Sequence, residues 1–126
     1  MLLAGEIDCR EGISGAVQKG YYASHDAAIE QTASIYVNAI VALMAQYKMS
    51  IYVHPVCPPS NPTETERART VQQFNETLRV RIASSTPPRG LQLRFLDFHA
   101  DLCEPQCYGG PPTSLSLHHE FRCDGE

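Results

Sequence analysis

The sequence predicts an α/β fold built on a parallel sheet, and two observations support this prediction. Short apolar or β-prone runs alternate with longer segments in which apolar residues recur every three or four positions. The prolines fall between these segments, where they mark loops. The predicted order is strand, helix, strand, helix, strand. Because a helical crossover joins each strand to the next, the strands are expected to lie parallel.

The N-terminal half is expected to contain a strand, a short helical segment and a long helix. The strand covers residues 1–8, which begin as a short apolar run, and helical turns over 11–19 end at Gly20. A helix over 25–48 follows, with Ser24 as its N-cap. Its apolar stripe consists of Ile29, Ala33, Tyr36, Ile40, Leu43, Met44 and Tyr47.

The C-terminal half continues the alternation with a strand, a helix and a strand. A short β-prone run over 50–53 precedes a proline-rich loop. A helix over 63–84 is predicted from the capping box that begins at Thr63. The third strand covers 91–98, and residues 99–126 are expected to form an irregular segment rich in Cys, Pro and Gly.

Polar side chains follow all of the predicted strands at their carboxyl ends. In parallel sheets these ends share one edge, and ligands bind there. Residues two apart in an extended backbone share a face, so Glu6, Asp8 and Arg10 would project together. The residues expected at this edge are Glu6, Asp8, Arg10, His54, Asp97 and His99. Their convergence predicts a functional site.

Each of these residues also has a purely structural interpretation. Glu6, Asp8 and Arg10 fit a strand end that is capped by a surface ion pair. His54 fits a hydrogen-bonded loop residue, and Asp97 fits a loop cap. The residues alone leave both interpretations open.

Composition narrows the classes of function. The chain has 126 residues, which suits a single domain, and its hydrophobic content of 43% suits a globular core. The net charge of −4 argues against a nucleic-acid binder, because the basic surface that such a partner needs is missing. No apolar run approaches the ~20 residues of a membrane span. No secretion signal is visible either, which favours a cytoplasmic protein without a membrane partner.

Three segments resemble one group of SGNH (GDSL-type) hydrolase-like proteins. They are Gly-Glu-Ile-Asp-Cys-Arg-Glu-Gly-Ile over 5–13, Ile-Tyr-Val-His-Pro-Val-Cys-Pro-Pro over 51–59 and Phe-Leu-Asp-Phe over 95–98, in the order of that family. The resemblance implies a three-layer α/β/α, flavodoxin-like fold with a parallel sheet. It also implies hydrolysis of an acyl or acetyl ester of a small molecule or glycan by a serine nucleophile, without a cofactor.

The resemblance assigns roles to individual residues. Gly5 and Asp8 match a Gly-x-Asn-Asp block that forms part of the oxyanion hole, but Ile7 stands in place of the asparagine. Asp8 is expected to shape the loop through its carboxylate, with Arg10 as a charge partner. The expected substrate-binding or oxyanion-binding residues are Gly5, Glu6, Asp8, Arg10 and His54.

The catalytic residues of the family are only partly present. No Gly-Asp-Ser block occurs, and Asp124 matches the start of an Asp-x-x-His whose histidine would follow the last residue. We therefore expect residues 1–126 to be a single partial domain, incomplete at both ends and inactive as an esterase on its own. Its first strand would lack an upstream neighbour, so self-association through an exposed sheet edge is also expected.

An alternative is a non-catalytic α/β interaction module with a zinc-binding tail. The soft ligands of this tail would be Cys103, Cys107, His118 or His119, and Cys123. Their spacing departs from common zinc knuckles, and Cys103 and Cys107 would equally suit a loop disulfide. Because no secretion signal is visible, mostly reduced thiols without a bound metal are the favoured interpretation of the five cysteines.

Overall fold

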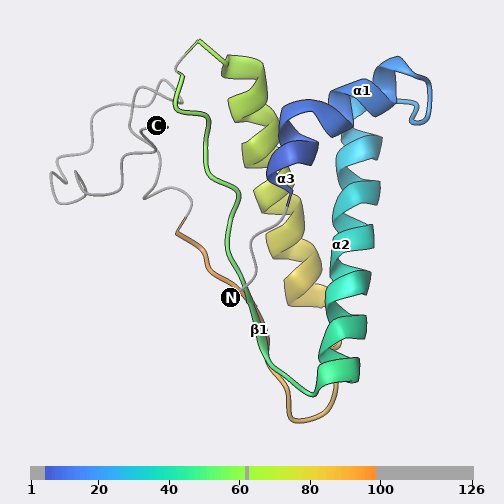
Figure 1. Ribbon diagram of the computed structural model, residues 1–126, viewed down its shortest axis with the longest axis vertical. Coiled ribbons are helices and arrows are strands. Elements are labelled where there is room, and N and C mark those ends of the chain that lie inside the picture. The colour runs from blue at the N-terminus through green and yellow to red at the C-terminus, as the bar shows by residue number, and fades with distance from the viewer. Residues whose placement is uncertain (1–4, 62, 99–126) are drawn as a thin grey trace, which may run out of the picture.

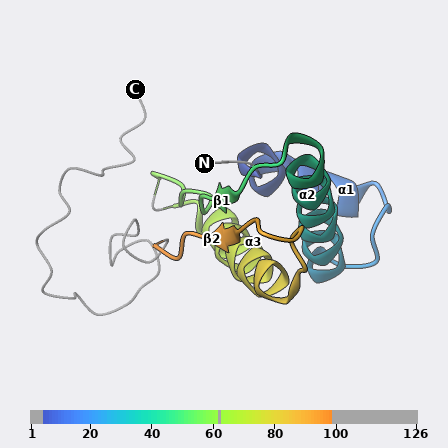
Figure 2. The same ribbon diagram turned by 90° about the horizontal axis from the view of Figure 1, so that it is seen from below.

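The computed structural model describes residues 5–61 and 63–98. Its elements, in chain order, are the π-helix η1 (Asp8–Gly12), helix α1 (Ile13–Gln18), helix α2 (His25–Tyr47), strand β1 (Ile51–Val53), helix α3 (Thr65–Ser84) and strand β2 (Leu93–Phe95). Helices α2 and α3 lie side by side, and η1 with α1 crosses the ends at which both begin (Figure 1). The two strands run next to each other, and β2 packs against α3 (Figure 2).

The described residues form a mostly helical arrangement, so the predicted three-layer, flavodoxin-like fold is wrong. Strands β1 and β2 have three residues each and form a two-stranded parallel sheet, with Tyr52 opposite Arg94. Ile51 and Val53 are buried, whereas Tyr52 between them is 39% exposed. A three-layer fold needs a wider sheet that is covered on both faces. In the described part of the chain the sheet is too narrow for this, and its Tyr52 face is open.

The parallel strand–helix–strand unit that the sequence predicted is present in β1, α3 and β2. Within the described ranges each strand pairs only with the other, so each keeps one open edge. Unpaired backbone groups at such an edge are able to pair with another chain. Self-association through this edge stays a prediction.

The predicted first strand is wrong where the structure describes it, because residues 6–8 are helical. Gly5 has a φ of 98°, a left-handed conformation that interrupts an extended run. The Cys9 N–H then donates to the Gly5 carbonyl at 2.9 Å, which starts a helical turn. Cys9 and Ile13 are buried at a spacing of four, while Ile7 is 65% exposed. A strand would have placed Ile7 and Cys9 on the same face, so only a helix matches this burial pattern.

The long helix predicted over 25–48 is confirmed as α2. The Ser24 Oγ accepts a hydrogen bond from the Ala27 N–H at 3.1 Å, as expected of the N-cap. Lys48 follows the last turn with a φ of 53°, which ends the helix in a left-handed residue. The helical turns predicted before Gly20 are confirmed as α1. Leu43 and Tyr47 of the predicted stripe are 40% and 62% exposed, so the stripe is wrong at these two positions. The buried residues of α2 are Ala28, Ile29, Ala33, Val37, Ile40 and Met44.

Helix α2 is also long and apolar enough to cross a membrane when judged by length and composition alone. In the fold it packs against α1 and α3, and the Tyr36 ring meets Phe74 of α3 edge-on at 5.8 Å. Of the most apolar 18-residue stretch of α2, 33% is buried inside the fold. One side of α2 thus packs in the core, and the absence of a membrane partner stays a prediction.

The helix predicted over 63–84 is confirmed as α3, but the predicted capping box is wrong. Glu64 is the N-cap residue and makes no side-chain capping bond. Thr63 donates from its backbone N–H and its hydroxyl to Asn61 Oδ1, at 3.0 and 2.8 Å. Asn61 thereby engages the threonine that would have capped the helix. The large buried apolar residues of α3 are Val71, Phe74, Leu78 and Ile82.

A buried asparagine joins α3 to the loop that follows β1. The Asn75 Oδ1 accepts from the Val56 N–H at 2.8 Å, and its Nδ2 donates to the Val56 carbonyl at 2.9 Å. Asn75 and Val56 are only 4% and 1% exposed. The pairing supplies the hydrogen bonds that buried polar groups require, and it fixes the proline-rich loop against the middle of α3.

Candidate functional site

The Gly-Glu-Ile-Asp segment begins at a glycine that packs tightly against α3. A Cβ atom on Gly5 would lie 2.5 Å from Cε1 of Phe74 and 3.4 Å from Cγ2 of Val56. The Phe74 side chain is fully buried, so it has little room to move aside. Together with the positive φ, this close approach requires glycine. Because Val56 follows soon after β1, the contact sets the segment beside the carboxyl end of that strand.

Glu6 faces α3, where it joins a network of carboxylates and guanidinium groups. We call this network the charged side; its members are Glu6, Arg10, Glu11, Glu64 and Arg67. Glu6 Oε1 lies 2.8 Å from Nη2 of Arg67, whose Nη1 lies 2.9 Å from Oε2 of Glu64. Arg10 approaches Glu6 at 3.8 Å and Glu11 at 3.3 Å. Arg67 is the centre of the network, since its side chain is 24% exposed and bridges two elements. Its buried Nε has no hydrogen-bond partner among the described residues.

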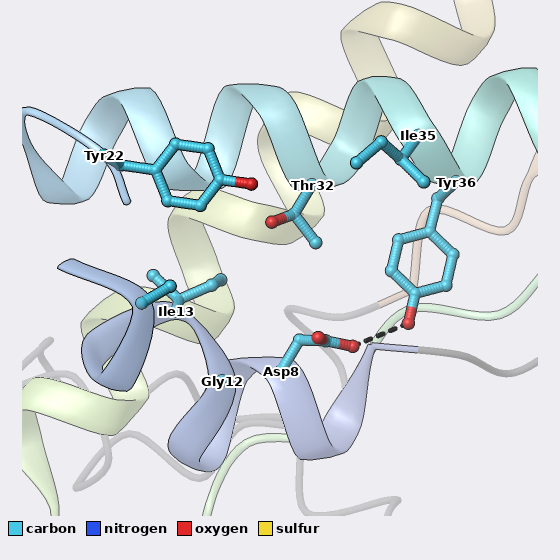
Figure 3. Close-up of a pocket in the computed structure, with 8 residues that line it drawn as sticks. Asp8, Gly12, Ile13, Tyr22, Thr32, Ile35 and Tyr36 are labelled. Carbon is cyan, nitrogen blue, oxygen red and sulfur yellow. Dashed lines mark hydrogen bonds between the residues drawn. The ribbon is translucent and has the colours of Figure 1, made fainter. Parts of the chain in front are cut away.

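Asp8 points the other way, toward α2. Its Oδ2 accepts a hydrogen bond from the Tyr36 hydroxyl at 2.6 Å (Figure 3). The pair lies at an open pocket of about 320 Å³, the tyrosine pocket, whose lining includes Asp8, Ile13, Tyr22, Thr32, Ile35 and Tyr36. Burial raises the pKa of Tyr36 to about 12, and the hydrogen bond to Asp8 and the charge of Asp8 act in the same direction. The Tyr36 hydroxyl therefore keeps its proton at neutral pH and remains a donor to Asp8.

The expectation that Glu6, Asp8 and Arg10 project together is wrong. In a helix, residues four apart share a side and residues two apart do not. Glu6 and Arg10 therefore meet on the charged side, and Asp8 lies at the tyrosine pocket. Arg10 pairs with Glu6 and Glu11, so the expected Asp8–Arg10 pair is also wrong. The segment that carries both sides, η1, is a π-helical turn in which the Ile13 N–H donates to the Asp8 carbonyl. Turns of this kind are frequent at functional sites.

His54 follows β1, as the sequence predicted. Its Nδ1 lies 2.6 Å from the Pro55 carbonyl oxygen, and its ring packs edge-on against Phe98 at 4.8 Å. These contacts favour the interpretation as a hydrogen-bonded loop residue. Asp97 is exposed. The other predicted residues lie outside the described residues: His99, Cys103, Cys107, His118, His119, Cys123 and Asp124.

Among the described residues, the side chains that most often act as nucleophiles or metal ligands are held in other roles. His25 Nε2 lies 3.4 Å from the Thr70 hydroxyl, but that hydroxyl donates to the Glu66 carbonyl. In the described ranges no group of three or more His, Cys, Asp and Glu side chains is placed to hold a metal. Burial raises the pKa of Cys9 to about 12, with the charge of Asp8 as the next cause. This thiol stays protonated and is a poor nucleophile.

Three residues that the sequence analysis did not predict at the site shape this region: Tyr36, Arg67 and Asn75. The apolar stripe places Tyr36 in the core, but the partner of its hydroxyl depends on packing between helices. Arg67 and Asn75 look like ordinary polar positions of an amphipathic helix. A signal for the helical N-terminus does exist, because apolar residues there recur at a spacing of four. They are Cys9, Ile13 and Val17.

Comparisons with protein-family models, with curated proteins and with solved structures each find no match for this chain. The resemblance to SGNH hydrolases therefore stays an expectation from the sequence, and the function has to be argued from the site itself.

Proposed function

We propose that the chain is part of an ester hydrolase of the SGNH type, and that its charged side forms one wall of the site for an acyl or acetyl ester. One observation carries this proposal. Gly5 packs so tightly against Phe74 and Val56 that the Gly-Glu-Ile-Asp segment is fixed beside the carboxyl end of β1. Ligands of parallel strand–helix–strand units bind at this end. An oxyanion-hole block would have to lie in this position.

Arg10 is the residue of the charged side that is best suited to contact the substrate. Its side chain is 47% exposed, and its guanidinium forms ion pairs with Glu6 at 3.8 Å and with Glu11 at 3.3 Å. A guanidinium carries several N–H donors and stabilises the negative charge that develops on an ester oxygen. Ile7 offers no donor at the position where the family has asparagine, so we assign this role to Arg10.

Arg67 is a positioning residue in this proposal. It binds the same Glu6 oxygen that Arg10 approaches, and it ties that carboxylate to Glu64 at the start of α3. Its side chain is less exposed than those of its partners, which suits a structural centre rather than a substrate contact. The orientation of Arg10 thus depends on Arg67 through Glu6.

The nucleophile and its base come from residues outside the described part of the chain. The serine hydroxyl gives its proton to the histidine of the Asp-x-x-His pair and attacks the ester carbonyl, and the alcohol leaves with that proton. Water then hydrolyses the acyl-enzyme through the same base. Asp124 is the candidate for the carboxylate that orients the histidine.

The test uses the full-length product of the gene with a fluorophosphonate probe and an activated acetyl ester. We expect the probe to modify a serine outside residues 1–126. Arg10→Gln should lower kcat/KM about tenfold, which is roughly 1.4 kcal/mol of transition-state stabilisation, without changing the melting temperature. Arg79→Gln removes another half-exposed arginine, which pairs with Glu76, and serves as the matched control with an unchanged kcat/KM.

Two results would contradict the proposal. One is a full-length protein in which no serine reacts with the probe and no ester is hydrolysed. The other is an Arg10→Gln variant whose kcat/KM equals that of the native protein. The 126-residue chain alone should show no turnover, and a single Ser→Ala change that abolished such turnover would place a nucleophile inside it.

A further inference from the structure

The tyrosine pocket contains a carboxylate that no cation of the described part neutralises. Asp8 takes part in none of the ion pairs among the described residues. Among the described lining residues it alone carries a charge. The Tyr36 hydroxyl donates to Oδ2, and none of the hydrogen bonds or ion pairs among the described residues involves Oδ1, which lies close to Gly12. A carboxylate oxygen with free lone pairs is therefore available to a donor from a ligand.

The hydrogen-bond donors around Asp8 are largely committed to other groups. The Thr32 hydroxyl donates to the Ala28 carbonyl at 2.7 Å, and the Tyr36 hydroxyl donates to Asp8. Figure 3 shows Tyr22 and Tyr36 at opposite ends of the pocket with Thr32 between them. The pocket thus presents an anionic acceptor and aromatic surface, which is the opposite of what an anionic ligand needs.

The remaining walls of the pocket are apolar. Ile13 lies on the same side as Asp8, and Ile35 belongs to the opposite wall, on α2 (Figure 3). Ile35 is 56% exposed, so a ligand with an apolar body would remove hydrocarbon surface from water there. The volume of about 320 Å³ is at the lower end of the range for small-molecule sites.

We propose that the tyrosine pocket binds a small organic ammonium ion, a protonated primary amine on an aromatic or alkyl body. The ammonium group donates to Asp8 Oδ1 and is attracted by the ring of Tyr36, whose hydroxyl contacts the same carboxylate. The apolar body packs against Ile13, Tyr22 and Ile35. This inference goes beyond ester hydrolysis, because the pocket and the charged side lie on different sides of η1 and the ligand carries no ester.

The test is a titration of the 126-residue chain with benzylammonium chloride, followed by heteronuclear NMR. We expect a Kd of about 1 mM, with the largest shift changes at the amides of Gly12, Thr32 and Tyr36. Benzyl alcohol has nearly the same shape without the charge and should bind at least about tenfold more weakly. Equal affinity for the two probes, or no binding of benzylammonium up to about 20 mM, would overturn the proposal.

Variants locate the binding at Asp8. Asp8→Asn keeps an acceptor for the Tyr36 hydroxyl but removes the charge, and it should weaken benzylammonium at least about tenfold. Glu11→Gln removes the same charge from a side chain that is 74% exposed on the charged side, and its affinity should equal the native one. Ala16→Phe fills a wall of the pocket while Asp8 stays in place, and it should also abolish binding. Native affinity in either Asp8→Asn or Ala16→Phe would overturn the assignment, and Ala16→Phe decides if Asp8→Asn does not fold.

Discussion

The two sides of η1 differ in the charges that they expose. On the charged side, the half-exposed guanidinium of Arg10 pairs with the exposed carboxylates of Glu6 and Glu11, so the surface offers both hydrogen-bond donors and acceptors. At the tyrosine pocket, the hydroxyl of Tyr36 holds the carboxylate of Asp8, so the exposed surface offers an acceptor. The comparison teaches that one short helical segment, residues 6–12, presents a mixed-charge surface toward α3 and a carboxylate acceptor toward α2.

The two sides also differ in what they contribute to stability. Ion pairs between exposed side chains contribute little each, about 0–1 kcal/mol, and Arg67 is the one cation of the charged side that is mostly buried. A hydrogen bond to a charged group, as between Tyr36 and Asp8, contributes about 1.5–3 kcal/mol. Both sides depend on Gly5, because its contact with Phe74 fixes where η1 starts.

Gly5→Ala should have the largest effect, because it disrupts both sides together. The added Cβ atom meets Phe74, and the left-handed φ of 98° is costly for alanine. We expect the free energy of unfolding to fall by about 3 kcal/mol or more in urea titrations. Gly20→Ala is the matched control: Gly20 also has a positive φ, of 75°, but no atom lies within 4 Å of the added Cβ. It should cost only about 1 kcal/mol, and equal losses in the two variants would mean that the contact with Phe74 is not tight.

Arg67→Met tests the charged side alone. The change keeps the apolar stem of the side chain and removes both ion pairs to Glu6 and Glu64. Because those carboxylates are about two-fifths exposed and regain water, we expect the unfolding free energy to fall by only about 1 kcal/mol. Arg81→Met, which breaks a more exposed pair with Glu30, should cost less than about 0.5 kcal/mol. A larger loss for Arg81→Met than for Arg67→Met would contradict a structural role for the charged side.

The smallest predicted effect concerns Cys9, which lies beneath both sides. Burial raises its pKa from 9.0 to about 12, the charge of Asp8 adds to the rise, and the charge of Arg67 opposes it. The unfolded thiol loses its proton near pH 9, so above that pH the unfolded state binds fewer protons than the folded state. Stability is therefore complete below pH 9 and falls as the pH rises toward about 12.

This pH dependence is measured by urea unfolding of the native protein and of Cys9→Ala. We expect the native protein to lose roughly half a kcal/mol more than the variant between about pH 7 and pH 9. Parallel pH profiles would show that Cys9 titrates in the folded protein as it does in the unfolded chain.

The sequence is sufficient to predict the elements whose stability depends on their own pattern. The helix α2 and its cap at Ser24 follow from spacing and turn residues, and the parallel pairing of β1 with β2 follows from the helical crossover. The predicted stripe of α2 is only partly right, because its members Leu43 and Tyr47 are exposed. The first segment is ambiguous, because a short apolar run fits a strand and a buried helix equally well. The fourfold spacing of Cys9 and Ile13 resolves it in favour of helix once their burial is known.

The candidate site is less predictable than the helices that carry it. Glu6 and Arg67 are separated by 61 positions, and Asp8 and Tyr36 by 28, so both contacts depend on how η1 docks on α3 and α2. That docking is fixed by the contact between Gly5 and Phe74, which a single sequence does not reveal. The number of layers in the fold is equally hard to predict from the sequence, because it depends on how many strands pair and not on the residue pattern within any one strand.

The pairing of Asn75 with Val56 has a mechanical consequence. The loop after β1 is fixed at Val56, near its start, to the middle of α3, so this part of the loop is not free to swing as a lid. A displacement of the loop has to carry α3 with it, and α3 in turn supports Gly5 through Phe74. A ligand that pressed on the loop would therefore shift the wall of the site as a rigid body, and the stiffness of that coupling depends on one amide side chain.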